Sequence, residues 1–400
     1  MSNIKIELPA LGNLFVDEKG CFKKEDAIKL GGMIAGVCYD KEGFNHIVGE
    51  PEEKTNRRID LTLGNGHHSV YDHISIMMNL QNIPKILAMV LNNEHQYTTS
   101  EKSARYTPVV RTEDSPISQD EEILYNKWID LFKMKIKHSY GDVYNDSKIQ
   151  KLAQENARYL VTVFMPTTMI HTTTFRQINY LASYMQRYID EADMSDAFEY
   201  QLANAMKEFI NELDRLNILE ERLMRNEKHG SLSLFNKKLN MNEEFFGNVY
   251  ETSAEVSFAE LAQAQRHRTL YYTMEMMKDK QFYVPRIIRN DQAMVDEWLN
   301  DMNKIKDVTP QGELVKVYEM GLYDKFILKC KERLCSAAQL EIMEQTRDTL
   351  LQYKNELENN GSNLAEDIES YTHGARCTFP DYECPQSCGF NEGITLSRKI

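Results

Sequence analysis

The stretch His73-Ile-Ser-Ile-Met-Met-Asn-Leu80 distinguishes this sequence from an all-helical one. Its apolar residues fall on every second position, which is the period of a strand with one buried face. Pro84 follows a few residues later, and proline suits the first turn of a helix, so we expect a helix from there through Leu91. A strand that leads directly into a helix predicts an α+β fold.

Most of the remaining chain has a helical pattern, with apolar residues at three- and four-residue spacing. The segments with this pattern are Lys24–Tyr39, Gln119–Tyr140, Lys148–Phe164, Thr172–Ile189, Ser195–Arg225, Ser253–Met277 and Met320–Lys354. We expect a short extended segment over Tyr283–Ile288 and a polar linker over Asn226–Asn248. Strand patterns are few and short, so helices should dominate the fold.

Length and charge limit the classes of protein to consider. A chain of 400 residues exceeds the size of one hydrophobic core, so we expect two or more substructures. Lys and Arg number 47 against 61 Asp and Glu, a net charge of −14, which makes general nucleic-acid binding unfavourable. No apolar run is long enough to span a bilayer, and the first nine residues lack signal-peptide order, so we expect a cytoplasmic protein with no membrane partner.

Seven cysteines, an odd number, do not indicate a disulfide framework. Three of them crowd the tail, in the pattern His373-x3-Cys377-x6-Cys384-x3-Cys388. Four soft ligands are enough for tetrahedral zinc, although the Cys-x2-Cys knuckle of common zinc sites is missing. Packed reduced cysteines and redox-active thiols are the alternatives for this tail.

Three polar stretches are candidates for chemistry, and each also has a purely structural interpretation. Residues 66–73, Gly-His-His-Ser-Val-Tyr-Asp-His, can bind phosphate, a flavin or a metal, or form a polar turn. Residues 100–106, Ser-Glu-Lys-Ser-Ala-Arg-Tyr, suit a nucleotide phosphate, or form a solvated loop. Residues 263–268, Gln-Ala-Gln-Arg-His-Arg, place two arginines on different helix faces, for two anionic groups or for an exposed basic patch.

Together these stretches resemble the flavin-dependent thymidylate synthase family. Its signature is Arg-His-Arg, seven residues, then Ser-x-Arg-Tyr, with Gly-His-x-Ser/Thr-x-x-Glu-His upstream. The first half of this chain has the upstream segment, with Asp for Glu, and Ser103-Ala-Arg-Tyr106, but Asn93-Glu-His95 in the Arg-His-Arg position. The second half has Arg266-His-Arg268 intact, but Met276-Met-Lys-Asp279 in the other position.

Further motifs are divided between the halves in the same way. Arg333 with Ala338-Gln-Leu-Glu-Ile342 resembles the family's Arg followed by Ala-Gln-x-Glu-Ile, whereas Ala197-Phe-Glu-Tyr200 has lost the Gln and Glu. Ala157-Arg158 in the first half resembles a family Ala-Arg pair. The resemblance therefore implies two diverged tandem copies of this fold, helix-dominated with short antiparallel sheets: residues 1–228 and 229–360, followed by a Cys-containing tail over 361–400.

The family implies reductive C5 methylation of dUMP to dTMP, with methylenetetrahydrofolate as carbon donor and NADPH to reduce FAD. The residues that would hold dUMP by position are Glu101, Ser103, Arg105, Arg158, Gln263 and Arg333. Those on the flavin side are Arg266, His267, Arg268, His67, Ser69, Asp72 and Arg176. Arg266, Ser103 and Arg333 form the catalytic set.

Two features of the resemblance leave the activity and assembly open. The departures from the family pattern allow another pyrimidine nucleotide, another C5 reaction such as hydroxymethylation, or a non-catalytic binding or scaffold protein. In the family, different subunits of a tetramer build each active site. Since each chain here would contain two fused copies of the fold, a homodimer would contain four copies and would form a pseudo-tetramer.

Overall fold

The computed structural model describes residues 4–37, 40–64, 67–94, 96–103, 111, 116–225, 232–235, 249–265, 270–380, 382, 384 and 388–400. It separates into two compact units. The first unit contains residues up to 102 and 164–233, and the second unit contains 117–163 and the chain from 234 onward. The units therefore interleave along the sequence, and the domain boundaries placed after residues 228 and 360 stay a prediction.

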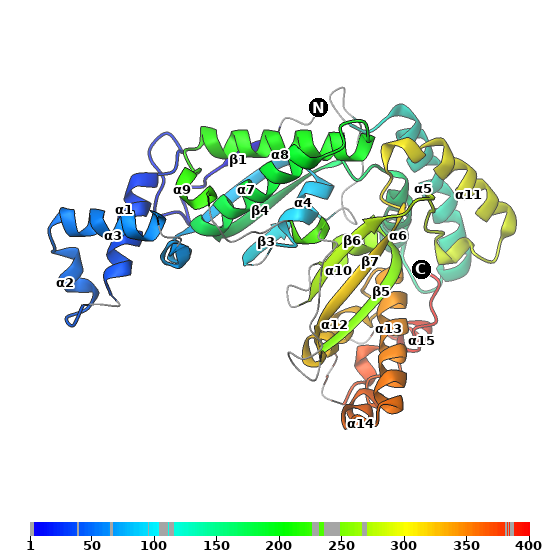
Figure 1. The fold of residues 1–400 in the computed structure, drawn as a ribbon. Coiled ribbons are helices and arrows are strands. Elements are labelled where there is room, and N and C mark those ends of the chain that lie inside the picture. Colours follow the sequence, from blue (N-terminus) through cyan, green and yellow to red (C-terminus); the bar gives the residue numbers. More distant parts are fainter. Residues whose placement is uncertain are drawn as a thin grey trace. The chain divides into compact units, whose positions relative to one another are not determined.

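The first unit contains a four-stranded antiparallel sheet in the order β1-β2-β4-β3. Its strands are β1 (Lys5–Glu7), β2 (Ser75–Pro84), β3 (Tyr97–Glu101) and β4 (Pro166–Thr174). β2 contains most of the strand expected from the alternation, and its side chains Ile76, Met78 and Leu80 are fully buried. Helix α4 (Lys85–Leu91) begins directly after Pro84, which confirms the strand-to-helix transition that defined the fold class (Figure 1).

The helices of the first unit are α1 (Lys24–Gly36), α2 (Phe44–Val48), α3 (Glu52–Gly64), η1 (His68–His73, a 3-10 turn), α7 (Phe175–Glu191), α8 (Ala197–Arg215) and α9 (Glu221–Met224). α7 packs against β4, and α8 packs against α7 and β1. The helix expected from Thr172 starts three residues later, because Thr174 completes β4 and accepts the first-turn N–H of Gln177. The helix expected through Arg225 ends at Arg215, since Asn217 adopts a left-handed backbone with φ 58°.

The second unit has a three-stranded antiparallel sheet in the order β5-β7-β6. Its strands are β5 (Val249–Ser257), β6 (Tyr271–Met276) and β7 (Leu314–Leu322). Its helices are α5 (Gln119–Tyr140), α6 (Asp146–Ala157), α10 (Phe258–Ala264), α11 (Gln292–Lys304), α12 (Tyr323–Arg333), α13 (Leu340–Asn359), α14 (Leu364–Glu369) and α15 (Asn391–Ile394). Short 3-10 turns occur at η2 (Arg158–Leu160), η4 (Arg286–Ile288), η5 (Lys306–Val308) and η6 (Arg376–Thr378), and η3 spans Ser233–Phe235.

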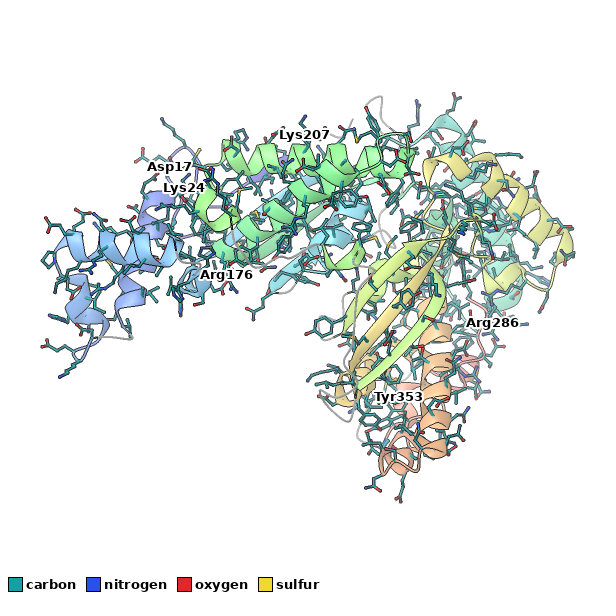
Figure 2. The ribbon with its side chains drawn as sticks, in the orientation of Figure 1. Asp17, Lys24, Arg176, Lys207, Arg286 and Tyr353 are labelled. Carbon is teal, nitrogen blue, oxygen red and sulfur yellow. The ribbon has the colours of Figure 1, made fainter. Side chains whose placement is uncertain are left out.

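Packing in the second unit brings α10, α12 and α13 onto its sheet. Tyr353 of α13, labelled in Figure 2, packs edge-to-face against Phe326 of α12 and at a tilt against Tyr250 of β5, at ring-centroid distances of 5.7 and 5.3 Å. α5 occupies the range that its periodicity predicts and starts with a capping box between Ser118 and Glu121. Among the described residues, no helix combines the length and the apolar character needed to cross a bilayer.

Three helix predictions in this unit were wrong in part. Ser253–Met277 is a strand, a seven-residue helix and a second strand, because β5 and β6 both pair with β7 along their length. Met320–Lys354 begins as the end of β7 and continues as two separate helices. The helix expected through Phe164 ends at Ala157 and continues as η2. In each case the segment contains several short elements, and an element of this length does not show a clear periodicity of its own.

The two sheets repeat one order of elements: strand, seven-residue helix and strand, and then a central strand followed by two helices. The pairing registers correspond as well. The strands β2 and β3 of the first sheet match β5 and β6 of the second sheet with the same difference in residue number, so that Pro84 corresponds to Ser257 and Thr98 to Tyr271. In the first sheet these residues pair with positions 166 and 172 of the central strand β4, and in the second sheet with positions 314 and 320 of the central strand β7. The difference in residue number between the two central strands is again the same at both pairs. This correspondence supports a tandem duplication, which stays a proposal.

Candidate functional site

Three of the residues predicted to bind a nucleotide meet in the second unit. Arg158 starts η2, Gln263 lies near the end of α10, and Arg333 is the last residue of α12. Arg158 Nη2 and Gln263 Nε2 both donate hydrogen bonds to Oε1 of Gln339. Arg333 Nη2 donates to the backbone carbonyl of Gln263 at 3.1 Å. Residues from both halves of the sequence therefore form one group.

Gln339 and Tyr159 hold this group in place, and neither was among the predicted site residues. Gln339 Nε2 donates to the Tyr159 hydroxyl, which in turn donates to Glu341 Oε2 at 2.8 Å. Glu341 also accepts from the backbone N–H and the hydroxyl of Ser257, at 2.8 and 2.6 Å. The family motif around Gln339 gave a signal for that residue, whereas nothing in the sequence pointed to Tyr159.

The direction of these hydrogen bonds follows from the carboxylate at the end of the chain of contacts. Glu341 accepts, so the Tyr159 hydroxyl must donate to it and accept from the Gln339 amide nitrogen. The Gln339 oxygen is then left to accept from Arg158 and Gln263. Burial raises the pKa of Glu341, and its hydrogen bonds from Ser257 and Tyr159 oppose that rise.

Two buried polar atoms of this group have no hydrogen-bond partner among the described residues. They are Nε of Arg158 and Oε1 of Gln263, and each residue is only 6% exposed. Leaving a buried donor or acceptor unpaired costs about 1–3 kcal/mol, so native proteins rarely do so without a bound partner. The group thus contains one buried donor and one buried acceptor whose hydrogen-bonding capacity is not used by the described residues.

A buried ion pair lies one helical turn from Arg333. Lys329 is fully buried on α12 and its Nζ contacts Glu319 Oε2 of β7 at 2.5 Å. The same Nζ donates to Gln345 of α13 at 3.2 Å, and the Tyr250 hydroxyl donates to Glu319 at 2.7 Å. These contacts link β5, β7, α12 and α13, and so they fix the helix that carries Arg333.

Glu260 adds a second carboxyl beside this ion pair, one turn before Gln263 on α10. Burial raises the pKa of Glu260 to about 8; the positive charge of Lys329 opposes the rise, while Glu341 and Glu319 add to it. The Glu260 side chain is 2% exposed. Near neutral pH this carboxyl is therefore mostly protonated, and the carboxylate that pairs with Lys329 among the described residues is Glu319.

The raised pKa of Glu260 predicts that the second unit loses stability as pH rises. Between about 4.5 and about 8 the folded chain holds a proton that the unfolded chain releases, so the free energy of unfolding falls by up to about 1.4 kcal/mol per pH unit. Glu260→Gln removes this dependence and should gain stability on the wild type across that window. Both tryptophans, Trp128 and Trp298, lie in the second unit, so the fluorescence of a denaturant titration measures it. A stability difference that is the same at both ends of the window would contradict this assignment.

On the flavin side, the predicted residues Asp72 and Arg176 form a bidentate pair in the first unit. Arg176 Nε donates to Asp72 Oδ1 at 2.9 Å, and its Nη2 contacts Oδ2 at 2.5 Å (Figure 2). Thr174 Oγ1 donates to the same carboxylate at 2.7 Å. His67 and Ser69 are exposed on the same turn. The pair therefore orients a polar, accessible turn at the start of β2.

The histidines of residues 66–73 do not act as one metal-ligating cluster. His68 is buried, with Nδ1 hydrogen-bonded to the Tyr180 hydroxyl at 2.9 Å and Nε2 to the Leu63 carbonyl at 3.2 Å. Both ring nitrogens are used, so His68 has a structural role. Neighbouring His67 is exposed and keeps its place among the candidates for the flavin side.

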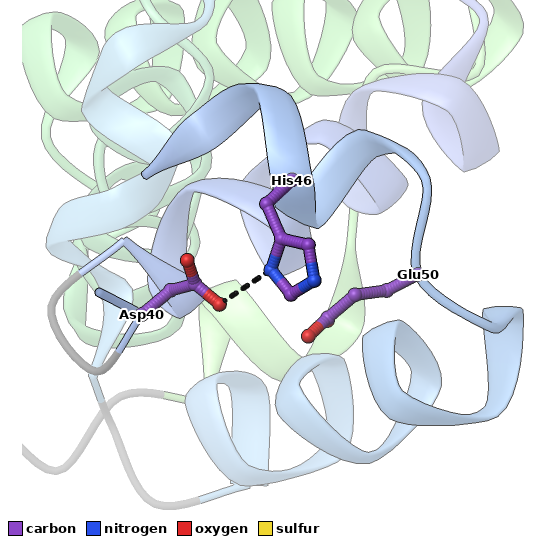
Figure 3. A group of neighbouring side chains, drawn as sticks. All are labelled: Asp40, His46 and Glu50. Carbon is purple, nitrogen blue, oxygen red and sulfur yellow. Dashed lines mark hydrogen bonds and ion pairs between the residues drawn. The ribbon is translucent and has the colours of Figure 1, made fainter. Parts of the chain in front are cut away.

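Among the described residues, the His, Cys, Asp and Glu side chains with the spacing of metal ligands are Asp40, His46 and Glu50 (Figure 3). Asp40 already accepts from His46 Nδ1 and from two backbone N–H groups, each at 2.8 Å. Glu50 accepts from Arg58 at 2.7 Å and from Lys54 at 3.4 Å. These partners occupy both carboxylates, so we assign the group to closing the turn that precedes α2.

The remaining predicted residues fall into two sets. Glu101 belongs to the first unit, where its almost fully buried side chain pairs with Lys85 at 2.5 Å, and Ser103 is grouped with the second unit. Arg105, Arg266, His267 and Arg268 lie outside the described residues. Their roles, and the approach of Glu101 and Ser103 to a nucleotide, stay predictions.

Comparison with known proteins agrees with the motifs. Residues 23–188 match the family described as thymidylate synthase complementing protein. No curated protein matches this chain. One matching crystal structure is a UMP/dUMP methylase, PolB from Streptomyces cacaoi, bound with 5-Br dUMP. It is 16% identical to this chain, the match covers 56% of this chain and 96% of the methylase chain, and the TM-score is 0.32. The family match spans the motifs at 66–73 and 103–106, and residues 23–188 of this chain are thus similar to the flavin-dependent thymidylate synthase family.

Proposed function

We propose that this chain is a flavin-dependent thymidylate synthase-like enzyme that methylates dUMP at C5, with methylenetetrahydrofolate as carbon donor and NADPH as reductant of FAD. The family domain over residues 23–188 supports modification of a pyrimidine nucleotide. The observation that carries the proposal is the buried group of Arg158, Gln263 and Gln339, with its unpaired donor and acceptor.

The chemistry of this group matches the imide edge of uracil. Uracil presents carbonyl acceptors on either side of an N–H donor. Arg158 Nε–H can donate to a carbonyl, and Gln263 Oε1 can accept from the N–H. A cytosine ring has a lone pair in place of that N–H, which would face the Gln263 oxygen. The site should therefore prefer uracil over cytosine, because the wrong base leaves buried polar atoms unpaired.

Arginine side chains near this group would balance the nucleotide's charge. The Arg333 guanidinium is oriented by its bond to the Gln263 carbonyl, and its positive charge would polarise the uracil ring. Arg105, with Glu101 and Ser103, would complete the nucleotide side. Preorganised donors of this kind act strongly where water is excluded.

FAD would supply the hydride transfer. The donor set on the flavin side fits such a group, because the Asp72–Arg176 pair holds a turn where His67 and Ser69 expose polar side chains. Arg266, His267 and Arg268 would complete this side. The described residues then have two tasks: the turn binds the cofactor, and Arg158 and Gln263 orient the uracil ring.

The division of motifs between the two sheets supports a homodimer that acts as a pseudo-tetramer. The first half retains the nucleotide motif at 103–106, where the second half has Met276-Met-Lys-Asp279 instead. The second half retains Arg-His-Arg at 266–268, where the first half has Asn93-Glu-His95. Each copy thus supplies what the other lacks, as expected where different subunits build one site.

Product analysis tests the proposed reaction. Full-length protein loaded with FAD is incubated with dUMP, methylenetetrahydrofolate and NADPH, and the nucleotides are separated and identified by mass spectrometry. We expect dTMP from the wild type and none from Arg266→Ala. A 5-hydroxymethyl product would assign the alternative C5 reaction. Bound flavin and dUMP with no modified product would show a non-catalytic homologue.

A further inference from the structure

The C-terminal tail of the second unit surrounds a cavity together with the end of α12. The cavity has a volume of about 440 Å³ and is lined by four cysteines. Cys335 comes from the loop after α12, whereas Cys377, Cys384 and Cys388 come from the tail. None of the four forms a disulfide, and the three tail cysteines are exposed.

Hydrogen bonds beside Cys335 and Cys377 anchor the walls of this cavity. The backbone N–H of Arg376 donates to the carbonyl of Leu334 at 2.7 Å, so the residues preceding Cys377 and Cys335 are joined directly. The Arg376 side chain also donates to the carbonyl of Lys331 at 3.2 Å. Cys335 and Cys377 thus each follow a residue whose backbone is held by a direct hydrogen bond between the tail and the loop after α12.

Residues near the C-terminal end of the chain make further hydrogen bonds around this cavity. Arg398 is 2% exposed and its Nη2 donates to the carbonyl of Ala338 at 2.6 Å. The backbone N–H of Ala375 donates to the carbonyl of Ile394 at 2.8 Å. The first bond holds the end of the tail against the loop that carries Cys335, and the second joins two parts of the tail to each other.

We propose that Cys335, Cys377, Cys384 and Cys388 bind one zinc ion as a structural tetrathiolate site. Four sulfur ligands make a closed tetrahedral zinc site, in which no position is left for water. No carboxylate or imidazole lines the described cavity, so a hard cation finds no anionic oxygen ligand there. Four thiolates around a divalent ion leave a net negative charge, and the Arg376 guanidinium lines the same cavity to balance it.

This ligand set differs from the one that the sequence spacing suggested. His373 is exposed and does not line the cavity, whereas Cys335, far earlier in the chain, does. The thiols stand around the cavity, and among the described residues no three of their sulfurs lie within 4.8 Å of one another. Zinc binding at Zn–S distances of about 2.3 Å would therefore draw the exposed thiols of Cys384 and Cys388 inward.

Elemental analysis of the full-length protein, purified under reducing conditions without chelators, tests this proposal. We expect about one zinc per chain in the wild type. Serine in place of Cys335, Cys377, Cys384 or Cys388 should each remove most of the zinc. Two matched controls should retain it: Cys21→Ser, a cysteine of the first unit, and His373→Ala, the nearby histidine outside the cavity.

A thiol titration of the wild type makes the test independent of whether the variants fold. Removal of the metal with a chelator should release four additional thiols that react with a thiol reagent under native conditions. Iron in place of zinc, no metal, disulfides within this set, or zinc lost in His373→Ala would each overturn the proposal.

Discussion

Replacing Arg158 by methionine should weaken dUMP binding about 100-fold, as measured by calorimetric titration of the full-length protein. A hydrogen bond to a charged group contributes about 1.5–3 kcal/mol, and 100-fold in Kd corresponds to about 2.7 kcal/mol. Arg158 is buried, its Nη2 is held by Gln339, and its Nε has no partner among the described residues. Methionine keeps an unbranched apolar side chain at this position and removes every donor.

The matched control is Arg347→Met, because Arg347 is an exposed arginine of α13 in the same unit. We expect the control to bind dUMP like the wild type. Thermal unfolding of both variants separates lost binding from lost folding. A folded Arg158→Met protein with wild-type affinity would show that the buried group does not hold the nucleotide.

Replacing Lys329 by methionine should lower the free energy of unfolding of the second unit by about 3–5 kcal/mol. Lys329 is fully buried, and its removal leaves the Glu319 carboxylate without its positive partner in a region of low dielectric. The measurement is a urea titration monitored by tryptophan fluorescence. Trp128 and Trp298 both lie in this unit, with their ring centroids 4.7 Å apart, so their emission reports its unfolding.

The double variant Lys329→Met with Glu319→Gln provides the control. It removes both charges, and the neutral amide can still accept from the Tyr250 hydroxyl. We therefore expect it to regain most of the stability that the single variant loses, because a buried pair is far less costly to replace than to break. A loss below about 1 kcal/mol in the single variant would contradict the structural role of this ion pair.

The sequence predicted the elements whose pattern is local. Alternation over 73–80 and the proline at 84 place β2 and α4, and α5 has the predicted bounds because its apolar period persists over six turns. The strand–helix–strand segment over 253–277 was missed because its helix has seven residues and the flanking strands read as part of one helical pattern.

Contacts between residues far apart in the sequence could not be predicted from the periodicity of apolar residues. Arg158 and Gln339 are far apart in the chain, and only the family resemblance singled out Arg158 and the motif around Gln339 before the structure joined them. Tyr159 lies at the centre of the same network without any sequence signal. In the tail, spacing favoured His373 as the fourth soft ligand, whereas the return of the chain to α12 brings Cys335 to the cavity.

A flavin absorbance titration tests most directly the central claim, that this chain joins a flavin and a pyrimidine nucleotide in one site. The full-length protein is loaded with FAD and titrated with dUMP while the flavin bands are recorded. We predict that the bands shift and that the shift saturates. We also predict that Arg266→Ala weakens the flavin bands and that Arg158→Met shifts the dUMP titration to higher concentration. Absence of bound flavin, or a flavin spectrum unchanged at saturating dUMP, would contradict the claim.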